Sequence, residues 1–230
     1  MIMSLMEKTT VLSQYTYEVC KNRFSTETAA QIYSTRHTLS KKGRREKACI
    51  QAALLGLPKN SLILDLPCGT GRISYFLHEL GYRVIAADYS SHMVEQAGKE
   101  LKDENIRFEQ QDIMSIQHAD NSFQAAICNR LFHHYPAAET RRLALKELMR
   151  VTDGPIIISF FNSLSLSACF SKLKNILRNR QPIDRVPISF YSFKKDIEAC
   201  GLRIEGSYFC RFGISPQTYL RLVGSRGEVC

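Results

Sequence analysis

Three carboxylates in the sequence each follow a short apolar segment. Asp65 ends "SLILD", Asp88 ends "YRVIAAD" and Asp112 ends "IRFEQQD". If these segments are parallel strands, their carboxyl ends meet at one edge of a sheet, which is where open α/β sheets bind ligands. Carboxylates gathered at that edge favour a positively charged ligand and repel a phosphate.

The turn after the first segment contains Gly69 and Gly71, and glycine lets the backbone approach a ligand closely. A dinucleotide-binding turn reads G-x-G-x-x-G and holds a pyrophosphate. Here Ser74 stands at the third glycine position, and Asp65 would repel the pyrophosphate. These residues disfavour an NAD-dependent oxidoreductase. S-adenosylmethionine fits better, because it carries a sulfonium, an ammonium and no phosphate.

Apolar segments alternate with amphipathic ones between residues 61 and 161, which is typical of a parallel sheet covered on both faces. Strands are expected at 61–66, 82–88, 106–112, 123–129 and 154–161, and helices at 71–80, 92–101 and 138–150. Two later strand candidates, 202–212 and 218–224, indicate an antiparallel addition at one edge. We therefore expect an α/β, Rossmann-like fold with a seven-stranded, mostly parallel sheet, an antiparallel strand at one edge and helices on both faces.

Taken together, "LDLPCGTGR", "VIAADYS" and "QQDI" closely resemble the class I S-adenosylmethionine-dependent methyltransferases, most of all their small-molecule branch. The resemblance implies that Asp65 lies near the methionine amino group of the cofactor, and that Gly69 and Gly71 pass beneath its methionine and ribose parts. It also implies that Asp88 accepts hydrogen bonds from both ribose hydroxyls, for which a carboxylate is well suited.

The same resemblance assigns roles at the next two strand ends. Asp112 would contact the adenine amino group, Ile113 would pack on the ring, and Asn129 would face the methionine end. Pro67 departs from the family pattern, because many members carry glycine there, and proline fixes φ and removes an N–H. The complete predicted cofactor site comprises Asp65, Pro67, Cys68, Gly69, Gly71, Asp88, Tyr89, Met93, Asp112, Ile113 and Asn129.

The segment "NRLFHHYP" follows the fourth strand, where the family places acceptor-side residues. His133 and His134 are the predicted catalytic residues, since histidine is the side chain best suited to act as a base near neutral pH. A hydroxyl acceptor needs such a base, so we expect methyl transfer to oxygen of a small-molecule or lipid-linked acceptor. The alternative is that one histidine packs under the following helix and the other is solvated.

Other functions remain open as alternatives. The net charge of +9 favours an RNA methyltransferase, but the D/N-P-P-F/Y pattern of amino-methylating nucleic-acid enzymes is absent. The only Pro-Cys pair, Pro67-Cys68, lies in the cofactor turn rather than at a cytosine-C5 nucleophile position, and Cys128 reads as core. Nucleic acid is therefore an unlikely partner. A non-catalytic S-adenosylmethionine-binding partner subunit is a further alternative.

We divide the chain into an N-terminal helical cap, residues 1–58, and a methyltransferase domain, residues 59–230, with a lid insertion at about 162–190. In the insertion, Leu166, Phe170, Leu173 and Leu177 follow a helical period. The basic residues Lys172, Lys174, Arg178, Arg180 and Arg185 face mostly elsewhere. Such a helix could contact an anionic membrane weakly; the alternative is a lid packed on the sheet edge with a solvated basic face.

The eight cysteines include no C-x-x-C pair, so we expect no metal site of the usual zinc spacing. The N-terminus lacks the basic start and long apolar run of a secretory signal. We therefore expect a cytoplasmic location. The sequence does not indicate the oligomeric state.

Overall fold

The computed structural model describes residues 41–100, 105–177 and 185–225. Most of the predicted cap, residues 1–40, and two of the predicted basic residues, Arg178 and Arg180, lie outside these ranges. The strands are β1 (Leu62–Asp65), β2 (Arg83–Asp88), β3 (Ile106–Gln110), β4 (Ala125–Cys128), β5 (Ile156–Phe161), β6 (Leu202–Phe209) and β7 (Gln217–Gly224). The helices are α4 (Lys41–Ala53), α5 (Arg72–Glu79), α6 (Ser91–Glu100), η1 (Phe132–His134), α7 (Ala138–Val151), α8 (Leu166–Leu177) and α9 (Phe190–Glu198).

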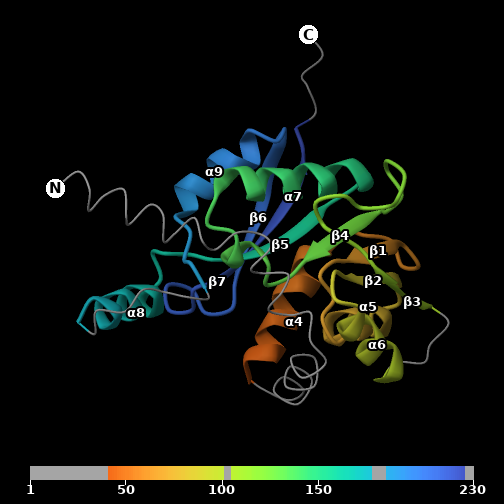
Figure 1. Cartoon of the computed structure of the whole chain (residues 1–230), viewed down its shortest axis with the longest axis horizontal. Helices are drawn as coiled ribbons and strands as arrows, with labels where there is room; N and C mark the ends of the chain where they lie inside the picture. The colour runs from red at the N-terminus through yellow and green to blue at the C-terminus, as the bar shows by residue number, and fades with distance from the viewer. Residues whose placement is uncertain (1–40, 101–104, 178–184, 226–230) are drawn as a thin grey trace, which may run out of the picture.

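The strands form one seven-stranded sheet in the order β3-β2-β1-β4-β5-β7-β6 (Figure 1). Strands β1 to β5 are parallel, while β7 pairs antiparallel with both β5 and β6. The predicted Rossmann-like, mostly parallel sheet is therefore confirmed. The antiparallel strand β7 lies one position inside the edge, with β6 outermost.

Successive residues of β1 point to opposite faces of the sheet and enter separate cores. Leu64 joins the core beneath α7 and α9, together with Leu148 and Phe193. Ile63 joins the core beneath α4 and α5, together with Ile50 of α4. Helices thus cover both faces (Figure 1). The central strands β1, β4 and β5 are largely apolar because both of their faces are buried.

Helix α4, the described part of the predicted cap, is packed directly on the sheet. Its residues Cys49, Ile50 and Ala53 are buried in the core, and Arg221 of β7 donates a hydrogen bond to the carbonyl of Ala53. The division of the chain at residue 58 stays a prediction.

The predicted insertion leaves the sheet at the end of β5 and returns to the same point. Ile188 donates its N–H to the Phe161 carbonyl (2.7 Å) and accepts the N–H of Ser163 (3.0 Å). Helix α8 lies within this excursion, as expected from its helical period. Among the described residues, no helix combines the length and apolarity needed to cross a bilayer.

Candidate functional site

The loop between β1 and α5 is a tight turn held by its own backbone. The N–H of Cys68 donates to the Ala87 carbonyl of β2 (2.7 Å), and the N–H of Gly71 donates to the Cys68 carbonyl (3.1 Å). Gly69 and Gly71 have φ values of 56° and 81°, a left-handed conformation that favours glycine. Pro67 follows a cis peptide bond in this loop. The turn therefore needs glycines at the two positions where the sequence has them.

Asp88, at the end of β2, ties two loops together. One carboxylate oxygen, Oδ2, accepts the N–H of Gly69 (2.9 Å), and the other, Oδ1, accepts the N–H of Ser90 (3.0 Å). Burial raises the pKa of Asp88 to about 6, although these hydrogen bonds act in the opposite direction. Each oxygen has a second lone pair, so Asp88 can still accept hydroxyl groups of a ligand.

Asp65, at the end of β1, is fully buried and only half satisfied. Its Oδ2 accepts the hydroxyl of Ser74 (2.6 Å), while its Oδ1 has no hydrogen-bond partner in the described part of the chain. Desolvation raises the pKa of Asp65 to about 7, while the Ser74 hydrogen bond and the charge of Arg72 oppose the rise and the charge of Asp88 adds to it. A buried carboxylate oxygen without a partner is costly, and an ammonium group would satisfy it. The site therefore fits the methionine amino group of S-adenosylmethionine.

The remaining predicted residues around this turn differ in exposure. Cys68 is buried, and desolvation together with the charges of Asp88 and Asp65 raises the pKa of its thiol, so the structure brings these three residues together. Met93 is also buried, in α6, whereas Tyr89 is exposed.

At the end of β3, Asp112 is half-buried and accepts the N–H of Met114 (2.9 Å). Ile113 is buried in the core beneath α7 and α9. Asp112 thus follows the third parallel strand beside β2, as the sequence pattern requires. The adenine contacts of Asp112 and Ile113 stay predictions.

Asn129, at the end of β4, belongs to a buried polar network that the sequence did not indicate. Its Oδ1 accepts the hydroxyls of Tyr219 (2.9 Å) and Ser159 (3.1 Å), and Gln217 donates to the hydroxyl of Tyr219 (2.8 Å). The side-chain oxygen of Asn129 is therefore held by β5 and β7. This network fixes the side chain that the resemblance places at the methionine end.

A second feature missed from the sequence is an ionic cluster built on Glu46 of α4. Glu46 is fully buried, and its two oxygens accept Arg72 Nη2 (2.7 Å) and Arg130 Nε (2.9 Å). Arg72 follows the glycine turn and Arg130 follows Asn129, so α4 is joined to two strand ends. Arg130 also has a left-handed φ of 60° and donates its N–H to Ser159 (2.8 Å). Such strained residues concentrate at functional sites.

One signal for this cluster was present in the sequence. Arg72 and Arg130 each stand next to a predicted site residue, Gly71 and Asn129. Glu46, in contrast, lies in the charged run "KKGRREK", where nothing distinguishes a buried acid from a solvated one.

His133 and His134 lie in the short helix η1 directly after β4 and are both buried. The ring of His133 stacks on the ring of Phe161 of β5, with 4.0 Å between centroids and 8° between planes. The ring of His134 packs against the ring of His133, with 4.2 Å between centroids. The N–H of Val186 donates to the His133 carbonyl (2.9 Å), so the returning end of the insertion closes over η1. The expectation of one solvated histidine does not hold, because both rings are enclosed. Their catalytic role stays a prediction.

Comparison with known proteins identifies the domain. Residues 63–153 match the family model described as a methyltransferase domain. The chain is 36% identical over 104 residues to a demethylmenaquinone methyltransferase of Clavibacter sepedonicus, covering 44% of this chain and 41% of that protein. It is 28% identical over 145 residues to a malonyl-[acyl-carrier protein] O-methyltransferase of Hamiltonella defensa, covering 62% of this chain and 52% of that protein. The chain thus spans about half the length of these relatives.

Among solved structures, magnesium protoporphyrin IX methyltransferase (ChlM) from Synechocystis PCC 6803, with bound SAH, superposes with a TM-score of 0.73. The match covers 91% of this chain and 100% of that one at 18% identity, and it therefore establishes the shared fold. The glycine turn and the acids at the ends of β1 and β2 all lie within residues 63–153, which the family model matches. Residues 63–153 therefore form a methyltransferase domain, and the relatives and the shared fold support a class I S-adenosylmethionine-dependent methyltransferase.

Proposed function

We propose that the protein transfers a methyl group from S-adenosylmethionine to an oxygen atom of a small-molecule or lipid-linked acceptor. The observation that carries the proposal is the buried, half-satisfied Asp65 beside the left-handed turn of Gly69 and Gly71. A carboxylate in this position complements a cationic cofactor and opposes a phosphate. S-adenosylmethionine, when bound, supplies a methyl group on a sulfonium whose departing form is neutral.

The arginines of the Glu46 cluster are suited to bind the carboxylate at the methionine end of S-adenosylmethionine. Two guanidinium groups, Arg72 and Arg130, share one carboxylate, which leaves an excess of positive charge. Arg72 Nη1 is buried and has no hydrogen-bond partner in the described ranges. Arg72 is therefore suited to hold a carboxylate while Asp65 holds the neighbouring ammonium.

The acceptor side rests on His133 and His134. Both follow β4, at the same carboxyl edge of the sheet as Asp65, and both are enclosed by β5 and the returning insertion. In the proposed reaction one of them removes the proton of a hydroxyl acceptor, and the enclosure excludes water from the transfer. The O-methyltransferase named among the relatives is consistent with transfer to oxygen.

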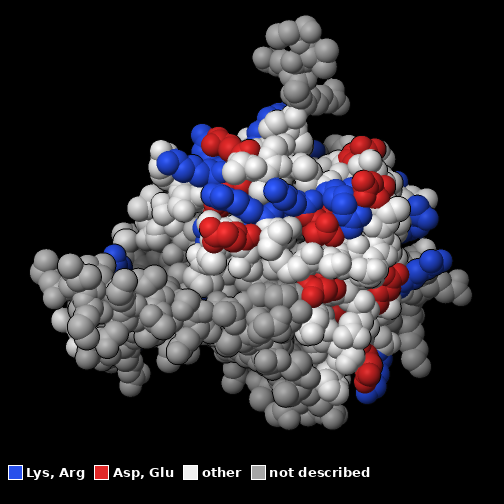
Figure 2. Space-filling view, turned by 45° about the horizontal axis from the view of Figure 1, so that its top comes forward, with Lys and Arg blue, Asp and Glu red and all other residues white. Residues whose placement is uncertain are grey.

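The RNA methyltransferase alternative rests on the net charge of +9. Figure 2 shows that basic residues on the face covered by α7 and α9 form a band with acidic residues on both sides. Two basic residues of α7 are held in ion pairs, Arg142 with Asp196 of α9 (3.0 Å) and Arg150 with Asp120 (2.8 Å). A face on which the positive charges are neutralised in this way does not favour a phosphate backbone, so we retain the small-molecule proposal.

The first test is calorimetric titration with S-adenosylmethionine, S-adenosylhomocysteine and NAD. We expect the two sulfur ligands to bind and NAD not to bind. Asp88→Ala should abolish this binding, because it removes the predicted ribose acceptor and frees the N–H of Gly69. The matched control is Asp153→Ala, an exposed acid before the amino end of β5, which should bind as the unchanged protein does. Binding of NAD alone would refute the proposal.

The second test separates an enzyme from a non-catalytic binding subunit. Protein that binds S-adenosylmethionine is incubated with radiolabelled cofactor and separate pools of hydroxyl compounds, quinols, lipid extracts and RNA. Label should move to an acceptor that extracts into organic solvent. Transfer to RNA and to no other pool would favour the alternative.

A further inference from the structure

Helix α8 presents its apolar side to solvent. At about 100° per residue, Leu166, Phe170, Leu173 and Leu177 fall within roughly 60° of the helix circumference. All four are exposed, Phe170 at 70% and Leu177 at 78%, whereas Ala168, on the other side of the helix, is buried. A surface helix of a globular protein normally buries such a stripe, so α8 exposes apolar surface that is usually covered.

The exposed stripe continues onto the β6–β7 turn. The first N–H groups of α8 donate to this turn, Leu166 to Gly213 (2.9 Å) and Ser167 to Ile214 (3.2 Å). Phe212 in the turn is 80% exposed, and Leu164 before the helix is 75% exposed. An open groove of about 470 Å³ is lined by Leu166, Phe170 and Lys174 of α8 and by Ile214 of the turn. We call this surface, made of α8, Leu164 and Phe212, the apolar patch.

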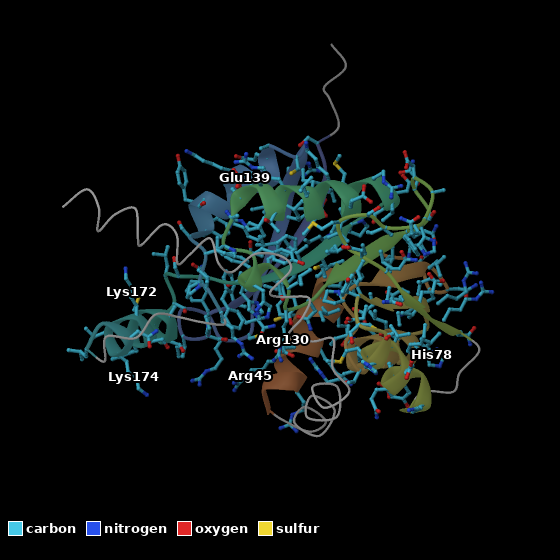
Figure 3. The ribbon with its side chains drawn as sticks, in the orientation of Figure 1. Arg45, His78, Arg130, Glu139, Lys172 and Lys174 are labelled. Atoms are coloured by element: carbon cyan, nitrogen blue, oxygen red, sulfur yellow. The ribbon has the colours of Figure 1, made fainter. Side chains whose placement is uncertain are left out.

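The charges around the apolar patch have one sign. Lys172 and Lys174 lie on opposite sides of α8 (Figure 3), and Arg211 is exposed in the turn. Within the described segments 162–177 and 209–217 there is no Asp or Glu. Two lysines that flank an apolar stripe can extend to the phosphates of a lipid surface while the stripe enters the acyl region. A second copy of this chain would instead bring like charges together.

We propose that the apolar patch binds the surface of a bilayer that contains anionic phospholipid. The patch lies beyond the carboxyl ends of β5 and β6, the same edge of the sheet that carries Asp65, Asp88 and Asn129. Membrane binding therefore turns the cofactor edge toward the bilayer and suits an apolar acceptor dissolved in it. The binding itself does not depend on the proposed transfer, so the two proposals can fail separately.

The experiment is co-sedimentation of the full chain with phosphatidylcholine vesicles, with and without phosphatidylglycerol, at low and high salt. Binding is expected to need phosphatidylglycerol and to weaken with salt. The double variant Phe170→Glu/Leu177→Glu should lose at least about ten-fold in vesicle affinity, because it places two charges in the apolar stripe. The matched control, Leu55→Glu/Leu143→Glu, makes the same charge change at two exposed leucines outside the patch and should bind almost normally.

Lys172→Gln and Lys174→Gln should each weaken binding by about five-fold and flatten the salt dependence. Absence of binding to every vesicle, or equal binding by the two double variants, would overturn the proposal. Two results obtained without vesicles would also overturn it. One is that the protein is a dimer and that Phe170→Glu/Leu177→Glu dissociates it. The other is that this variant lowers the unfolding midpoint while Leu55→Glu/Leu143→Glu does not. The first would identify a second copy as the occupant of the patch, and the second would identify the chain itself.

Discussion

The carboxyl edge of the sheet has two parts that differ in almost every physical property. At the ends of β1 and β2, Asp65 and Asp88 are buried, and Asp88 holds two loops by backbone hydrogen bonds. Beyond β5 and β6, the apolar patch exposes Phe170 and Phe212, and the charged residues within the described segments 162–177 and 209–217 are all basic. One part is polar and enclosed; the other is apolar and open.

The difference follows from what each part must recognise. A cofactor with fixed charges is bound best by carboxylates and loops already in place, because preorganisation lowers the cost of binding. The acceptor that we propose is apolar and offers few groups for hydrogen bonding, so hydrophobic surface would serve its side of the site. If the two parts are independent, substitutions in one should leave the properties of the other unchanged.

The largest effect is expected on turnover. Once an acceptor is found, His133→Ala/His134→Ala should lower kcat by about 10²–10⁴-fold, the usual contribution of a general base. Calorimetric affinity for S-adenosylmethionine should change little, because the two histidines are predicted to lie on the acceptor side. The control is His118→Ala, whose ring contacts Glu109 and Phe123. Unchanged kcat in the double variant would remove the general-base role.

The Glu46 cluster tests how firmly α4 is joined to the cofactor part. Glu46→Gln should lower the free energy of unfolding by about 3–5 kcal/mol, since it leaves two arginines without their shared carboxylate. The matched control, Glu79→Gln, alters an exposed pair with Lys47 at 3.9 Å and should change stability by less than about 1 kcal/mol. Urea unfolding measures both. Equal effects would mean that the cluster is not a buried ion pair in solution.

Asp65→Asn should have opposite effects on stability and on binding. The folded-state pKa of Asp65, about 7, lies above its ordinary value of 3.8. The stabilisation that its proton provides is therefore complete below pH 3.8 and lost as the pH rises through 7. In the ligand-free protein the variant should gain stability over the parent between pH 4 and 8, by on the order of 4 kcal/mol at most.

Affinity should move the other way. Only the ionised carboxylate of Asp65 pairs with an ammonium group. As the pH rises through the pKa of Asp65, from about 5.5 to about 8, the parent should therefore bind S-adenosylmethionine increasingly more tightly than Asp65→Asn does. Titration calorimetry at several pH values measures this difference. A variant that binds as tightly as the parent at pH 8 would exclude Asp65 from the ammonium contact.

The smallest effect is expected in the apolar patch. Phe170→Ala should change the free energy of unfolding by less than about 0.5 kcal/mol, because the ring is 70% exposed. Phe193→Ala, at a fully buried ring of α9, should cost about 3–5 kcal/mol. A large loss at Phe170 in urea unfolding would show that the patch is covered within the protein.

The central strands of the sheet could be predicted from sequence because both of their faces are buried, which makes segments such as 156–161 almost entirely apolar. The positions of Asp65 and Asp88 at strand ends could be predicted because the local sequence marks where each strand ends. Glu46 could not, because its burial depends on two arginines 26 and 84 residues away. The exposure of the apolar stripe of α8 could not be predicted either. The helical period shows that a stripe exists but does not show whether it faces the protein or the solvent.

The excursion between Asn162 and Ile188 has a consequence for how such a protein changes over generations. Its two ends are held side by side at the end of β5 by the bonds of Ile188 to Phe161 and Ser163. Loop-closure entropy rises only slowly with length, so this segment can be lengthened, shortened or exchanged at small cost to the sheet. If the insertion takes part in acceptor binding, as we propose, its exchange between relatives should change the acceptor and leave the cofactor turn unaltered.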